Sequence, residues 1–114
     1  MKEFEKSKII NLEKSVEYSG DSIVSKTALK KETGNISIFS FDKGQQLSEH
    51  TAPFDATVII LEGEANIIID KKKHELTKCD MIIMPANVPH AVEAKEKFKM
   101  MLILIKEPPK TIVL

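Results

Sequence analysis

Residues 57–70 read Thr57-Val-Ile-Ile-Leu-Glu-Gly-Glu-Ala-Asn-Ile-Ile-Ile-Asp70, two short apolar runs separated by a glycine. Runs of this length, rich in valine and isoleucine and bounded by turn-forming residues, are typical of β-strands. We therefore predict strands over 57–61 and 65–70, joined by a turn at Gly63.

The same pattern extends outward in both directions along the chain. Further strands are predicted over 22–29, 35–41, 73–77, 81–84, 90–93 and 98–106, with turns at Gly34, 42–44, 70–72 and 85–87. Residues 9–18 are ambiguous, since a short helix, a strand and an irregular arm all suit them. The sequence thus predicts an all-β fold, either a small barrel or a two-sheet sandwich.

The chain has 114 residues, which suffices for one domain with a single core. We divide it into an N-terminal arm (1–21), a barrel (22–106) and a C-terminal tail (107–114). The tail begins near Pro108-Pro109, and proline cannot donate a backbone hydrogen bond to continue a strand.

Composition excludes several classes of partner. Seventeen basic and seventeen acidic residues cancel, so no basic surface is expected for nucleic acid. The longest wholly apolar run, Met100–Ile105, is far shorter than the roughly 20 residues that cross a membrane. The charged start lacks the apolar stretch of a signal peptide, and the single cysteine, Cys79, cannot form an internal disulfide. We predict a cytoplasmic protein that binds neither nucleic acid nor membrane.

Several predicted strands are apolar on both faces, as in 57–61, 67–69 and 100–105. A barrel covers only the inner face of its strands. The outer face therefore needs a second cover, either the N-terminal arm or another copy of the chain. We predict a homodimer.

Two histidines stand out as candidate functional residues. His50 ends the segment Gly44-Gln-Gln-Leu-Ser-Glu-His50, and His90 ends Pro85-Ala-Asn-Val-Pro-His90. In an all-β chain of this size, histidines at these two places can face each other inside one barrel. They therefore indicate a pocket.

These segments resemble the paired motifs of the cupin superfamily, small β-barrel proteins of which many hold a metal. Gly44, His50 and Gly63 keep the spacing of the first motif, and Pro85 and His90 keep that of the second. The resemblance implies a cupin-type barrel, that is, a double-stranded β-helix or jelly roll.

In metal-binding cupins, three histidines and one glutamate usually hold the ion. Here the resemblance places those ligands at His50, residue 52, residue 56 and His90, but this chain has Ala52 and Ala56. Two imidazoles alone leave most of an ion's coordination to water or substrate, so Mn, Fe, Ni or Zn would be held weakly. Asp55 and Glu49 are the nearest substitutes, but strand alternation turns both outward.

Three interpretations of the histidine pair remain open. The pair is a purely structural one, or it contacts a small polar or anionic ligand, or it forms a weak metal site completed by substrate. The two alanines favour a ligand slightly, because they leave room for a molecule. The predicted ligand-binding residues are His50, Ala52, Ala56, Met84 and His90.

The function predicted from these residues is binding of a small molecule in the barrel pocket. The alternative is a metal-dependent enzyme of the dioxygenase, isomerase or cyclase type, which rests on likeness of fold alone. A dimer that is stable and binds nothing is a third possibility.

Two other residues carry weaker signals. His74 is expected on the surface. Cys79 stands where the second motif has a glycine, and no base lies beside it in the sequence to make it catalytic.

Overall fold

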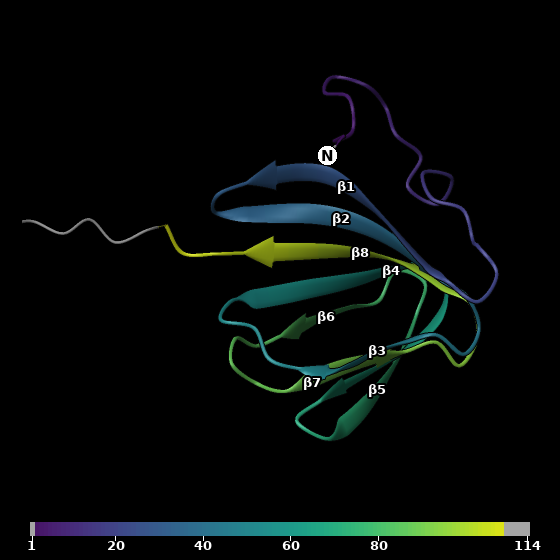
Figure 1. Ribbon diagram of the computed structural model, residues 1–114, viewed down its shortest axis with the longest axis vertical. Helices are drawn as coiled ribbons and strands as arrows, with labels where there is room; N and C mark the ends of the chain where they lie inside the picture. Colours follow the sequence, from purple (N-terminus) through teal and green to yellow (C-terminus); the bar gives the residue numbers. More distant parts are fainter. Residues whose placement is uncertain (1, 109–114) are drawn as a thin grey trace, which may run out of the picture.

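The computed structural model describes residues 2–108, which form eight strands and no helix, and so no helix that could cross a membrane (Figure 1). The strands are β1 (Ile23–Lys31), β2 (Gly34–Phe41), β3 (Gln46–His50), β4 (Asp55–Ile69), β5 (Lys72–Thr77), β6 (Met81–Met84), β7 (His90–Glu93) and β8 (Phe98–Ile105). The predicted all-β fold is confirmed. The division into arm, barrel and tail stays a prediction, and residues 109–114 of the tail lie outside the described residues.

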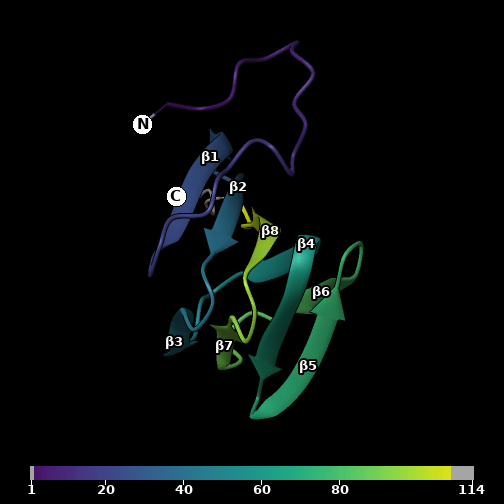
Figure 2. The same cartoon turned by 90° about the vertical axis from the view of Figure 1, so that its right-hand side faces the viewer.

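The strands form two antiparallel sheets that share β4. In the five-stranded sheet the order is β1-β2-β8-β4-β6, and in the four-stranded sheet it is β3-β7-β4-β5. The first half of β4 pairs with β6 and β8, and the second half pairs with β5 and β7. Figure 2 shows β4 running alongside β5 toward the lower end of the molecule. One continuous strand therefore joins the two walls of the barrel.

The turn predicted at Gly63 is wrong, because β4 continues through it. Gly63 still pairs with Phe98 of β8, and Glu64 already pairs with Thr77 of β5. A register shift at Ile60–Glu62 and a φ of 77° at Gly63 bend the strand from one sheet into the other. A glycine inside a strand can mark a bend as well as a turn, and here it marks a bend.

Strand β3 was not predicted. Its sequence, Gln46-Leu-Ser-Glu-His50, contains a single apolar residue, so the alternation that indicates a strand is missing. It forms because it pairs with β7 at the edge of the four-stranded sheet.

The core is solid at one end of the barrel and hollow at the other. At the solid end, the fully buried rings of Phe41 and Phe98 stack with their centroids 4.6 Å apart. Val58 and Ile60 of β4 are equally buried and belong to the same core. Further along β8, toward Leu104, the side chains border an open space.

The N-terminal arm is irregular, so of the three structures open for residues 9–18 the irregular one is found. Its turn at residues 12–14 is held by bonds from Lys14 N to Asn11 Oδ1 and from Ser15 Oγ to Leu12 O. Short polar side chains that bond their own backbone in this way compete with helix formation.

The arm is fastened to the outer face of the five-stranded sheet. Val16 is buried there, and Ser40 Oγ donates a hydrogen bond of 2.8 Å to Glu17 O. The buried ammonium group of Lys99 donates to Glu13 O and also lies 3.7 Å from the carboxylate of Glu62. The arm thus covers one end of this outer face.

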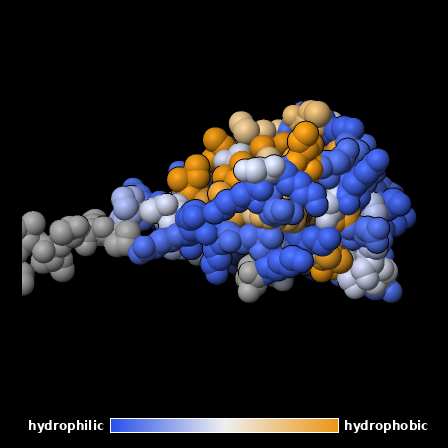
Figure 3. Space-filling view, turned by 90° about the horizontal axis from the view of Figure 1, so that it is seen from above, coloured by the Kyte–Doolittle hydropathy of each residue, from blue (hydrophilic) through white to orange (hydrophobic). Residues whose placement is uncertain are grey.

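The remainder of that face is apolar and open. Met81, Ile83 and Ile105 are 59%, 53% and 64% exposed, and their strand positions place them on the outer side of the five-stranded sheet. Ile9, in the projecting part of the arm, is 98% exposed. The space-filling view shows apolar surface gathered along one side of the molecule, among otherwise charged surface (Figure 3).

Candidate functional site

The hollow end of the barrel encloses a cavity of about 220 Å³ between the two sheets. Strands β3 and β7 bound it on one side, and β4, β6 and β8 bound it on the other. Nine of its eleven lining residues are apolar, and the other two are histidines. The lining consists of Leu47, His50, Ala52, Phe54, Ala56, Met84, His90, Val92, Met100, Leu102 and Leu104.

A local irregularity in β3 turns His50 toward the cavity. Leu47 and His50 are three residues apart, so regular alternation would place them on opposite faces. A register shift between Leu47 and His50 brings both side chains to the face of β3 that borders the cavity, and His50 pairs directly with His90 of β7. His90 and Val92, two residues apart, reach the cavity by ordinary alternation.

The two imidazoles meet at their Nε2 atoms, which are 3.1 Å apart. Each Nδ1 lies against a backbone carbonyl of its own strand or turn. His50 Nδ1 is 2.8 Å from Ser48 O, and His90 Nδ1 is 3.2 Å from Val88 O. Both rings are therefore held from behind, with their Nε2 edges directed at one point.

His90 is buried, whereas His50 is exposed at the barrel mouth. Burial is the main cause that lowers the pKa of His90, since it disfavours the charged imidazolium. The bond to Val88 O opposes this shift, and repulsion from His50 adds to it. The environment thus favours the neutral form of His90.

The structure brings all five predicted site residues to this one cavity: His50, Ala52, Ala56, Met84 and His90. The two alanines supply no ligand atom and leave the space that longer side chains would fill.

The two acidic substitutes considered for the missing ligands point elsewhere. Glu49 pairs with Lys71 at 2.9 Å on the surface, and Asp55 accepts a hydrogen bond from Ala86 N. Within residues 2–108, no group of three or more His, Cys, Asp or Glu side chains is placed to hold a metal ion. The four-ligand metal set of the family therefore does not fit the described residues.

Sequence reasoning missed several apolar residues of the lining. Leu47 was overlooked together with its strand, while Val92, Leu102 and Leu104 could not be told from ordinary core residues. Only the packing of the two sheets shows which apolar side chains border empty space.

Phe54 forms the wall between the cavity and a wider groove of about 450 Å³ at the barrel mouth. The groove is also lined by Asp55, Ile105 and Lys106, and the ammonium group of Lys106 lies 5.2 Å from the centre of the Phe54 ring. This ring is thus the side chain shared by the cavity and the solvent-facing groove.

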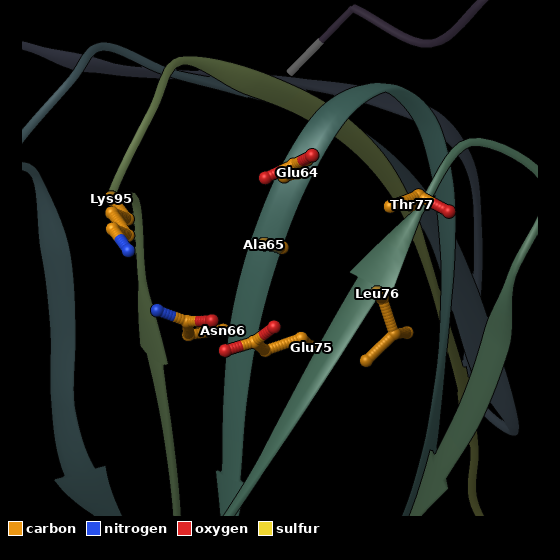
Figure 4. A pocket seen from close by; sticks show the side chains of 7 residues that line it. All are labelled: Glu64, Ala65, Asn66, Glu75, Leu76, Thr77 and Lys95. Carbon is orange, nitrogen blue, oxygen red and sulfur yellow. The ribbon is translucent and has the colours of Figure 1, made fainter.

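A second hollow lies over β4 and β5 and is polar rather than apolar (Figure 4). Asn66 and Glu75 stand side by side on these paired strands, and Lys95 approaches from the segment after β7. Its volume of about 90 Å³ equals only about three water molecules. It is too small to rival the barrel cavity as a ligand site.

Cys79, which stands where the second motif has glycine, and Asn87, in the turn before His90, both adopt the left-handed conformation. The φ angles are 72° at Cys79 and 63° at Asn87. Asparagine tolerates this region well, whereas the cysteine carries a strain of about 1 kcal/mol.

The surface position expected for His74 is wrong, because its ring is half-buried and its Nδ1 lies 3.3 Å from Ile67 O.

Comparison with known proteins connects this barrel to characterised folds. The model of the cupin domain family matches residues 37–106. A conserved protein of unknown function from Streptococcus pyogenes is 36% identical, with a TM-score of 0.87 over 96% of this chain and 98% of that one. A cupin 2 conserved barrel domain protein from Leptotrichia buccalis is 45% identical, with a TM-score of 0.82 over 85% of this chain and 47% of that one.

A glutamyl-tRNA reductase from Methanosphaera stadtmanae is 34% identical over 77 residues. That match covers 66% of this chain but only 17% of the reductase. The chain thus spans a small part of that enzyme's length.

Proposed function

The chain belongs to the cupin family, and we propose that it binds a small molecule in the barrel cavity. The family match and the solved cupin structures also confirm the cupin-type barrel predicted from the sequence. The compartment in which it acts belongs to the proposal: a cytoplasmic location suits a chain whose only cysteine has no partner.

One observation carries this proposal, an apolar cavity with a polar end. An engineered apolar cavity of about 150 Å³ holds benzene, so a space of about 220 Å³ accommodates a molecule of about one ring. Ligand sites commonly combine apolar walls with a few convergent polar groups, and His50 and His90 are such groups here.

The test is a binding screen of one-ring metabolites and fragments, followed by protein NMR. Ala52→Phe places a ring inside the cavity, and we expect it to abolish binding. Ala86→Phe is the matched control, because Ala86 lines the outer groove and not the cavity. Binding that survives Ala52→Phe and is lost in Ala86→Phe would move the site to the groove and contradict the proposal.

A second candidate function is a metal-dependent enzyme, of the dioxygenase, isomerase or cyclase type. The observation that favours it is the convergence of two Nε2 atoms 3.1 Å apart, from which both can reach one ion at the usual N–metal distance of about 2.0–2.1 Å. Ala52 and Ala56 leave the remaining positions without donors, so we derive no catalytic step.

Elemental mass spectrometry of protein purified without chelators or an affinity tag decides between the two candidates. About one ion per chain, lost in His50→Ala, would favour the enzyme. A protein that stays free of Mn, Fe, Ni and Zn when each is added below millimolar concentration would favour the binding protein.

A further inference from the structure

The hydrogen-bond partners of the histidine pair fix where its protons lie. A carbonyl oxygen can only accept, so the contacts to Ser48 O and Val88 O require a proton on each Nδ1. A neutral imidazole carries one ring proton. In the neutral pair, both Nε2 atoms of His50 and His90 are therefore unprotonated.

A hydrogen bond between the two Nε2 atoms would need a third proton, and the pair would then be a cation. No carboxylate stands among the described residues that line the cavity, and nine of the eleven are apolar. An uncompensated charge among apolar side chains is costly, and the described residues of the cavity lining offer no group that would stabilise the cation. In the neutral pair, the two Nδ1–carbonyl contacts leave two Nε2 lone pairs directed at one point.

Two lone pairs 3.1 Å apart repel each other, and a hydrogen-bond donor placed between them relieves the repulsion. A carboxylate ligand would bring further acceptor atoms to this point. An ammonium ligand would lose its hydration without meeting a counter-charge. An uncharged hydroxyl supplies the donor without either cost.

We propose that the ligand is a small, largely apolar molecule whose one uncharged hydroxyl donates to the paired Nε2 atoms of His50 and His90. This inference rests on the proposed function. The apolar body lies against Met84, Leu102 and Leu104. The cavity volume limits that body to about one ring.

Phenol, benzene and benzoate are the matched probes, because they share one ring and differ in the group they present. Each is titrated at neutral pH, in the presence of a chelator, and followed by calorimetry. We expect phenol to bind roughly threefold to tenfold more tightly than benzene, as one net hydrogen bond implies. Benzoate is expected to bind at least about tenfold more weakly than phenol.

The control is the double variant His50→Leu/His90→Leu, which keeps the cavity apolar and removes both acceptors. We expect it to bind phenol and benzene equally well. Should it fail to fold, the wild-type protein still gives a direct answer through ¹⁵N spectra of the histidine rings. Those spectra should show Nδ1–H and a bare Nε2 on both rings.

Each other outcome has a defined meaning. Equal binding of phenol and benzene to the wild-type protein, preference for benzoate, or an Nε2–H signal in the free protein would overturn the inference and leave the cavity as the binding site. Binding that requires added Zn or Mn would overturn it in favour of the metal site. If none of the probes binds, and Ala52→Phe changes nothing in the wider screen, the proposed function fails as well.

Discussion

Tyr18 illustrates how single side chains fasten the arm to the barrel. Its hydroxyl donates a hydrogen bond of 2.7 Å to Glu62 Oε2 on β4. Glu13 lies nearby on the arm, and the ammonium groups of Lys97 and Lys99 stand 4.8 and 5.0 Å from the ring centre. The pKa of Tyr18 is raised, chiefly by burial and then by the bond to Glu62.

We expect Tyr18→Phe to lower the free energy of unfolding by about 1 kcal/mol near neutral pH, the usual net value of one hydrogen bond. The folded pKa lies above the unfolded value, so the contribution of the phenol is complete below about pH 10 and is lost as pH rises further. The wild type should therefore lose its advantage over the variant in alkali. Urea unfolding of both proteins between about pH 7 and pH 12 measures this difference in the free energy of unfolding. Lysine titration in the same range is common to the two proteins and cancels. A difference that stays constant at every pH would contradict the assignment.

The candidate site shows how far single residues could be predicted. The positions of His50 and His90 among the predicted strands indicated one pocket, and the resemblance to the cupin motifs implied that Ala52 and Ala56 leave space in it. The bulge that turns His50 inward, the carbonyl partners of both rings and the half-burial of His74 depend on contacts between distant segments. No local pattern in the sequence encodes those contacts.

At the scale of elements, Gly63 is where β4 changes sheets. A Cβ added at Gly63 would overlap the Lys97 carbonyl oxygen and come within 2.9 Å of Phe98 Cα, while φ stays at 77°. Gly44 has a φ of 86°, yet nothing lies within 4 Å of the position its Cβ would take.

We expect Gly44→Ala to cost about 1 kcal/mol, from backbone conformation alone, and Gly63→Ala to cost about 3 kcal/mol or more, because strain and overlap add. Chemical denaturation of the two variants provides the comparison. Similar losses in both would show that the close approach at Gly63 is relieved by small shifts and does not constrain the bend.

Most strands could be predicted from the sequence. Apolar runs identified β1, β2, β5, β6, β7 and β8 to within about two residues at each end. They failed for β3, whose polar residues form a strand only because β7 offers a partner, and at Gly63, where a bend and a turn have the same local signature. Strand pairing, a long-range property, decided both cases.

At the scale of the whole molecule, we propose that the open outer face of the five-stranded sheet is covered by a second copy of the chain. The whole outer face, with five strands about 4.8 Å apart and up to about eight residues long, has a footprint of at most about 600 Å², and the arm covers one end of it. The open part is smaller than the roughly 800 Å² that each partner contributes to a stable interface of standard size, so it would form the apolar centre of such an interface. Met81 and Ile83 carry no charge, so the same surface can meet itself across a twofold axis.

We expect the wild-type protein to sediment as a dimer and Ile83→Lys to sediment as a folded monomer. Ile9→Lys is the control, since Ile9 is also exposed but lies on the arm, and removal of residues 109–114 tests the tail. Both controls should stay dimeric. A monomeric wild type, or a dimer lost only with the arm or tail change, would refute packing through the sheet face.

The sharing of β4 between the sheets has a consequence for how the barrel opens. Any fluctuation that releases β4 from β8 also disturbs the pairing of the same strand with β5 and β7. Neither wall can therefore melt as an independent foldon, and amide protons in both should exchange with solvent at the rate of global unfolding. Within residues 2–108, the arm and the edge strands are free to exchange sooner, so we expect a ligand to enter the cavity by local breathing of its rim and not by separation of the walls.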